Sequence, residues 1–102
     1  MATAIALYNA PVDPAAFDAY YASTHVPLAK RLPGLRSYEV SSGTIMTPGG
    51  VAPYHLVGVL RFDSMDDLLA ALASPEGEAV VADLPKFATG GVSVMFFDDE
   101  PA

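Results

Sequence analysis

Apolar and polar positions along the chain fall into short blocks whose periods predict strands and helices. Four runs have the length and composition of β-strands: residues 3–9, 35–46, 54–63 and 92–99. Between the first and second runs apolar positions recur at helical spacing, and they do so again between the third and fourth. The predicted element order is therefore β-α-β-β-α-β.

The first helix is expected over residues 14 to 24 or 25. Asp13 can accept from the free N–H groups of the first turn, and Pro14 has no N–H to leave unpaired there. Its inward stripe is predicted at positions spaced by four, four and three: Phe17, Tyr21, His25 and Leu28. Pro27 predicts a kink or a break, because proline disfavours helical angles at the residue before it.

The second helical region is expected in two parts. Ser64 precedes one apolar segment and Ser74 precedes another, and each serine can cap the helix that follows it. Pro85 is expected to end or kink the second part.

This element order is that of the ferredoxin-like fold. In this α+β arrangement a four-stranded antiparallel sheet carries its helices on one face. A chain of 102 residues is expected to form one domain, here residues 1–102.

The predicted strands are apolar on both faces. In the first strand Ile5 and Leu7 lie on one face and Tyr8 lies on the other. In the last strand Met95 and Phe97 likewise lie on the face opposite to other apolar residues. Leaving such side chains in water would forgo roughly 1.5–3 kcal/mol each. We therefore expect a homodimer in which two open sheet faces pack together as a dimeric α/β barrel. The alternatives are an extra helix over this face or tolerance of exposed apolar surface.

Composition narrows the function classes. The chain has 5 Lys and Arg against 12 Asp and Glu, a net charge of −7, so nucleic-acid binding is not expected. The absence of cysteine excludes disulfides, thiolate metal ligands and a cysteine nucleophile. No run approaches about 20 apolar residues and no signal-peptide pattern is found, so a membrane partner is not expected and the cytoplasm is the default compartment.

His25 is the main candidate for chemistry. An imidazole titrates near neutral pH, and this one lies on the inward stripe one turn after Tyr21. The alternative is a packing histidine that bonds a free backbone carbonyl. His55, at the start of a strand beside a loop, is a weaker candidate. No metal site is expected, because the two histidines are not spaced as ligands and no carboxylates cluster with them.

The segment from Tyr8 to Ala29 reads Y-N-x-P-x-D-P-x-x-F-D-x-Y-Y-x-x-x-H-x-P-L-A and is followed by L-P-G-L. It resembles the EthD family of dimeric α/β-barrel proteins. The resemblance implies a small cofactor-free protein, with relatives in ether degradation and in polyketide tailoring. It also implies roles for His25 of the H-x-P element and for Asp18 and Tyr21 of the D-x-Y-Y element.

Two functions fit these observations. The first is an enzyme, of oxidoreductase or other tailoring or degradation type, that holds a small apolar molecule between the first helix and the sheet. In it His25 moves a proton and Tyr21 orients the substrate. The residues expected to bind that molecule are Tyr8, Phe17, Leu28 and Tyr54. The second function is a non-catalytic carrier or accessory protein for a hydrophobic intermediate, and a purely structural dimer is a third. No cofactor is expected in any of them.

Overall fold

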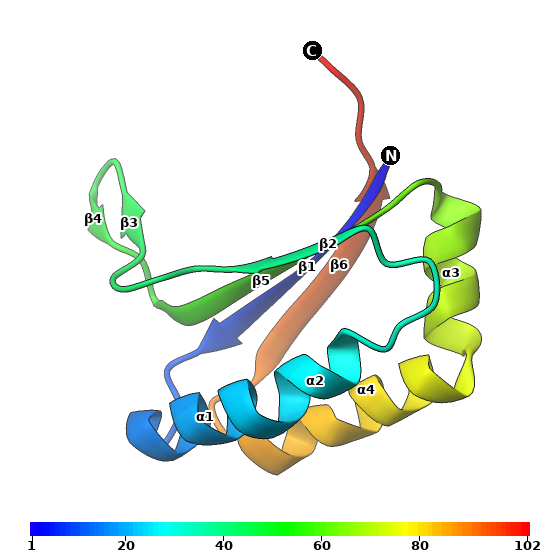
Figure 1. Cartoon of the computed structure of the whole chain (residues 1–102). Helices are drawn as coiled ribbons and strands as arrows, with labels where there is room; N and C mark the ends of the chain where they lie inside the picture. The colour runs from blue at the N-terminus through cyan, green and yellow to red at the C-terminus, as the bar shows by residue number, and fades with distance from the viewer.

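The computed structural model describes residues 1–102 and contains a four-stranded antiparallel sheet with all the helices on one face (Figure 1). The strands lie in the order β2-β5-β1-β6 and span Ser37–Val40 (β2), Tyr54–Phe62 (β5), Ala2–Asn9 (β1) and Val92–Asp98 (β6). A separate two-stranded sheet pairs β3 (Met46–Thr47) with β4 (Gly50–Val51). The predicted ferredoxin-like fold is confirmed.

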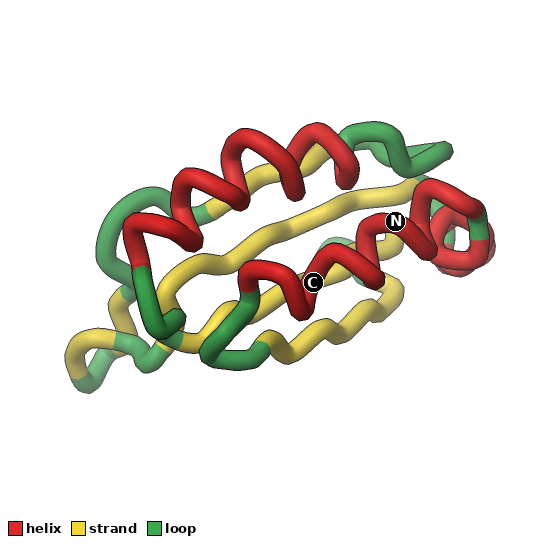
Figure 2. The backbone as a smooth tube through the Cα atoms, turned by 90° about the horizontal axis from the view of Figure 1, so that it is seen from below, coloured by secondary structure: helices red, strands yellow, loops and turns green.

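The helices form a layer beneath the four-stranded sheet (Figure 2). They are α1 (Pro14–Tyr20), a π-helical turn η1 (Tyr21–His25), α2 (Val26–Ala29), α3 (Met65–Ala73) and α4 (Pro75–Phe87). The predicted caps are present: the side chains of Asp13, Ser64 and Ser74 each accept a hydrogen bond from a backbone N–H three residues later. None of these helices is long and apolar enough to span a bilayer.

Of the kink or break predicted at Pro27, the break does not occur. Val26 keeps helical angles, and α1, η1 and α2 follow one another without a gap. The N–H of Val26 bonds to the carbonyl of Tyr21, five residues earlier, as a π-helical turn requires. One wider turn thus lies directly before the proline, and the chain stays helical through it.

Two further expectations are corrected. Helix α4 does not end at Pro85 but continues to Phe87, and the N–H that the proline lacks falls in the last turn of the helix. The long second strand expected over residues 35–46 is only β2, because the chain turns at Gly43, whose φ of +74° suits glycine. The residues beyond that turn form β3 of the separate hairpin.

The two faces of the sheet are divided as predicted. Ala4 lies opposite Leu60 and Phe96 on the helix-covered face, whereas Ile5 lies opposite Val59 and Met95 on the other. Apolar side chains on the face without helices are Ile5, Leu7, Val57, Val59, Met95 and Phe97, which we call the open sheet face.

The core between sheet and helices has two parts. One lies under α3 and includes Phe62 and Leu68. The other is an aromatic cluster of Tyr8, Phe17, Tyr21 and Phe87 between the sheet and the helices α1, η1 and α4. The candidate site lies where these two parts meet.

Candidate active site

An apolar cavity of about 210 Å³ lies between the sheet and the helices. Of its 18 lining residues 16 are hydrophobic, and they come from both parts of the core. Val81 on α4 and Val94 and Phe96 on β6 border its open side, where 53%, 50% and 42% of each residue is exposed. An apolar cavity of about 150 Å³ is known to hold benzene, so this one can hold a small organic molecule.

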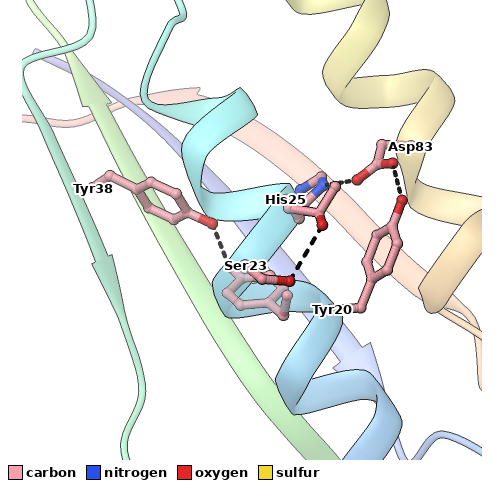
Figure 3. A network of polar contacts seen from close by, with 7 residues as sticks. Tyr20, Ser23, His25, Tyr38 and Asp83 are labelled. Carbon is pink, nitrogen blue, oxygen red and sulfur yellow. Dashed lines mark hydrogen bonds and ion pairs between the residues drawn. The ribbon is translucent and has the colours of Figure 1, made fainter.

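His25 lines this cavity and is held from behind by a carboxylate. Its Nδ1 lies 3.0 Å from Oδ2 of Asp83 on α4, and the other oxygen of that carboxylate accepts a hydrogen bond of 2.6 Å from the Tyr20 hydroxyl (Figure 3). Both His25 and Asp83 are only 3% exposed. Because an ionised carboxylate only accepts hydrogen bonds, Nδ1 of His25 carries the proton.

The other ring nitrogen of His25, Nε2, is therefore the one that is open to the cavity. Nε2 makes no hydrogen bond within the protein. Every fully buried side-chain nitrogen or oxygen does make one, so Nε2 is not fully buried. Nε2 must accordingly remain accessible through the cavity that His25 lines. An imidazole held through Nδ1 by a carboxylate, with its other nitrogen free, is the arrangement of a general base.

The protonation states fit this arrangement. Burial lowers the pKa of His25 below its ordinary value of 6.5, although the Asp83 carboxylate opposes the shift, so the ring is neutral at pH 7. For Asp83, burial alone would raise the pKa, but the hydrogen bonds from Tyr20 and His25 outweigh it and lower the pKa below 3.8. The pair is therefore a neutral base beside an ionised carboxylate.

Three tyrosines add polar groups to the cavity wall: Tyr8, Tyr21 and Tyr38. The hydroxyls of Tyr21 and Tyr38 are hydrogen-bonded to each other. Burial raises the pKa of all three phenols, so each hydroxyl keeps its proton at neutral pH.

Gly58 makes room for the tyrosine pair. It lies in the middle of β5 on the helix-covered face, and a Cβ atom there would stand 3.2 Å from the Tyr21 hydroxyl and 3.7 Å from Cε1 of Tyr38. A side chain at this position would crowd both rings. The glycine thus leaves room for both rings beside the backbone of β5.

The structure places the predicted site residues in four different surroundings. His25, Tyr21 and Tyr8 line the cavity. Phe17 packs behind it, with its ring 5.4 Å from that of Tyr8 and 5.7 Å from that of Tyr21. Leu28 lies outside, in a shallow surface hollow between α2 and the start of α4.

Tyr54 lies in a separate groove, together with His55. This outer groove, of about 650 Å³, is more open and more polar, and it runs between Tyr21 and the β3–β4 hairpin. Nε2 of His55 there contacts Asp18 at 2.7 Å. The Asp18 side chain is 61% exposed, so this second His–Asp pair is a solvated contact. The described residues contain no group of three or more His, Cys, Asp or Glu side chains that could hold a metal ion.

Asp83 is one of the site residues that the sequence analysis missed, together with Tyr20 and Tyr38. The signal for Asp83 lies in the spacing of α4, where Val80, Asp83, Leu84 and Phe87 occupy one face. A carboxylate within an otherwise apolar stripe is expected to be buried and paired.

Fold and site together define a ferredoxin-like α+β protein with a histidine–aspartate pair facing an apolar cavity. Residues 9–91 match the EthD domain. An 11.0 kDa protein encoded in the thcB–thcC intergenic region of Rhodococcus erythropolis is 39% identical over 94 residues, which cover 92% of this chain and 90% of that protein. The chain belongs to the EthD family.

Solved structures agree with this assignment. An EthD-family protein from Bacillus halodurans is 34% identical, with a TM-score of 0.89 over 98% of this chain and 99% of that one. SnoaB, a cofactor-independent oxygenase from Streptomyces nogalater, shares only the fold, at 18% identity and a TM-score of 0.67 over 99% and 94%. A dimeric ferredoxin-like protein from Thermobifida fusca also shares the fold, at 18% identity and a TM-score of 0.69 over 94% and 88%.

Proposed function

We propose that this protein is an enzyme that removes a proton from a small apolar organic molecule bound in the cavity. The observation that carries the proposal is the His25–Asp83 pair, whose unpartnered Nε2 lies at an otherwise apolar wall. Proton abstraction needs a base that is neutral and accessible at working pH, and His25 meets both conditions.

The proposed step needs no group other than those of the chain. The substrate proton moves to Nε2 of His25 as its bond to the substrate breaks, and the electron pair of that bond stays on the substrate. The imidazolium that forms is stabilised by the Asp83 carboxylate, which Tyr20 holds in place. Returning the proton to the same or another atom completes the cycle.

The lining favours an uncharged substrate. Apart from the His25 ring and three tyrosine hydroxyls, the wall is apolar, and no lysine or arginine reaches it. With a net charge of −7 the protein as a whole also repels anions. An oxidoreductase activity, like that of SnoaB, remains a narrower form of this proposal, in which the deprotonated substrate goes on to react with oxygen.

We also propose that two copies pair through the open sheet face and act in the cytoplasm. The six apolar side chains of that face include Met95, which is 46% exposed, and Phe97, which is 41% exposed. That a neighbour of the same fold is dimeric supports a homodimer. Burying this face in a two-fold dimer would recover the hydrophobic free energy that a monomer forgoes.

Hydrogen–deuterium exchange tests the enzyme. Small apolar ketones such as cyclohexanone and acetophenone are incubated with the protein in D₂O, and loss of the α-proton signals is followed by NMR with oxygen consumption measured in parallel. The wild type is expected to accelerate exchange, whereas His25→Gln removes the base and should lose about 10²-fold or more of that rate.

His55→Gln is the matched control, since His55 also contacts an aspartate but lies outside the cavity. It should exchange like the wild type. If ketones bind with equal affinity to all three proteins and none accelerates exchange, the protein is a carrier instead.

A further inference from the structure

We propose that the hydroxyl pair of Tyr21 and Tyr38 is an oxyanion site, which makes the substrate a small apolar ketone or phenol. This inference rests on the proposed function, because it names the group that receives the negative charge when His25 removes a proton. The ligand of the pair would be an enolate or phenolate oxygen. Packing in the core alone does not require such a ligand.

Counting protons on the pair shows a free donor. Two hydroxyls carry two protons, and the single hydrogen bond between them uses one. Apart from Tyr8, whose phenol also forms a side-chain hydrogen bond with Tyr21, neither hydroxyl has another side-chain partner. The second O–H is therefore available to a molecule in the cavity.

Tyr8 does not change this result. Its phenol lines the same cavity, and adding its hydroxyl to the chain adds one proton together with one bond. One O–H is left over in every arrangement. The hydroxyl that donates outward also accepts from its neighbour, and such a chain makes the outer donor stronger.

The donor and the base face one space. His25 and both tyrosines line the cavity, and the rings of Tyr21 and His25 have centroids 5.5 Å apart. When Nε2 takes an α proton, the C–H electron pair forms the C=C bond of an enolate and the carbonyl π pair moves to oxygen. The tyrosine O–H then donates to that oxygen in an apolar setting, where such a bond is worth most.

Gly58 leaves space for the pair beside the sheet. A methyl group at this residue would stand 3.2 Å from the Tyr21 hydroxyl and 3.7 Å from Cε1 of Tyr38, so the glycine keeps the Tyr21 hydroxyl uncrowded.

Binding of 4-nitrophenol tests the site, because its phenolate absorbs at a longer wavelength than the phenol. In the wild type the bound probe should remain phenolate at a pH at which free probe is mostly protonated. The double variant Tyr21→Phe/Tyr38→Phe should lose this preference and should slow ketone exchange by about 10²-fold, the usual loss on removing an oxyanion donor. Replacing both partners by rings of the same shape should keep the fold.

Tyr54→Phe is the matched control, since Tyr54 lies in the outer groove, and it should behave as the wild type. Failure of 4-nitrophenol to bind the wild type, an unchanged phenolate fraction, or loss of the preference in Tyr8→Phe but not in the double variant overturns the inference. If the double variant still exchanges ketones at the wild-type rate while His25→Gln does not, the oxyanion site is wrong and the base stands. If phenolate is preferred but the wild type exchanges no ketone, the proposed function is wrong instead.

Discussion

His25 and Asp83 are 58 positions apart in the sequence and meet only because η1 and α4 pack side by side. The carboxylate does two things for the histidine. It fixes the proton on Nδ1, and it stabilises the charge that appears when Nε2 takes a second proton. Tyr20 in turn holds the carboxylate, so the three residues act as one chain (Figure 3).

The pH profile of exchange should report the state of His25. The rate should rise with pH as His25 loses its proton and reach a plateau, with the midpoint below 6.5 because burial lowers this pKa.

In Asp83→Asn the midpoint should move to lower pH, since the carboxylate raises the His25 pKa. The plateau should also fall by about 10²-fold or more, because the amide no longer fixes the tautomer. Asp18→Asn is the control, and an unchanged plateau in Asp83→Asn would remove the aspartate from the mechanism.

The free energy of unfolding should also depend on pH through the lowered pKa of His25. The unfolded chain binds a proton at His25 below pH 6.5 while the folded protein resists it, so the free energy of unfolding falls as the pH drops below 6.5. Urea unfolding at about pH 7 and about pH 5 should show a smaller loss in His25→Gln than in the wild type. Equal losses in the two proteins would mean that the His25 pKa is not lowered.

At the scale of elements, the spacing of inward residues explains the π-helical turn. Phe17, Tyr21, His25 and Ala29 are buried at a strict spacing of four residues. An α-helix has 3.6 residues per turn, so this spacing would rotate steadily off the face, and one wider turn corrects it. A regular α-helix would place Leu28 inward instead, which is why the sequence analysis chose it.

Substitutions at these adjacent positions should separate the two registers. Ala29 is 1% exposed and lines the cavity, so Ala29→Leu should fill part of it and weaken 4-nitrophenol binding by about tenfold, or about 1.4 kcal/mol. Leu28→Ala changes a surface hollow and should leave that affinity within about twofold. Titration by absorbance measures both. The opposite order of effects would mean that Leu28 faces the bound molecule.

The sequence predicts the order of the elements well, but it predicts the effect of the prolines on the helices poorly. Apolar runs of strand length and helix caps are local signals, so the strands and the caps Asp13, Ser64 and Ser74 could be predicted from neighbouring residues. Pro27 and Pro85 predict breaks from local propensity, but packing of their helices against the sheet overrides it.

The candidate site was only half predictable for a related reason. His25 and Tyr21 lie on one helix with a readable stripe, whereas their partners Asp83 and Tyr38 come from α4 and β2. Pairs of this kind depend on how elements pack and not on spacing within one of them.

At the scale of the whole molecule, the sheet separates two apolar surfaces. The helix-covered face forms the core and the cavity, and the open sheet face lies on the opposite side (Figure 1). Pairing through the open face would therefore leave the cavity of each copy in place. Dimerisation and catalysis should accordingly respond to different substitutions.

Phe97→Glu should weaken the dimer without removing the cavity. It places a charge on the open sheet face and should raise the dissociation constant by roughly 30-fold or more, equivalent to about 2 kcal/mol. Sedimentation at micromolar concentration measures the shift. Val12→Glu, at a loop residue that is 87% exposed, is the control and should sediment as the wild type. A wild type that sediments as one copy would contradict the pairing.

The central claim is that His25 presents a bare Nε2 to the cavity, and ¹⁵N NMR of the imidazole rings tests it most directly. At about pH 7 we expect Nδ1 of His25 to be protonated and Nε2 to be bare, with the Nε2 signal moving when 4-nitrophenol or a ketone is added. His55, which contacts Asp18 through Nε2, should show the opposite tautomer. A charged His25 ring at that pH, a proton on Nε2, or a signal that ignores every ligand would contradict the account.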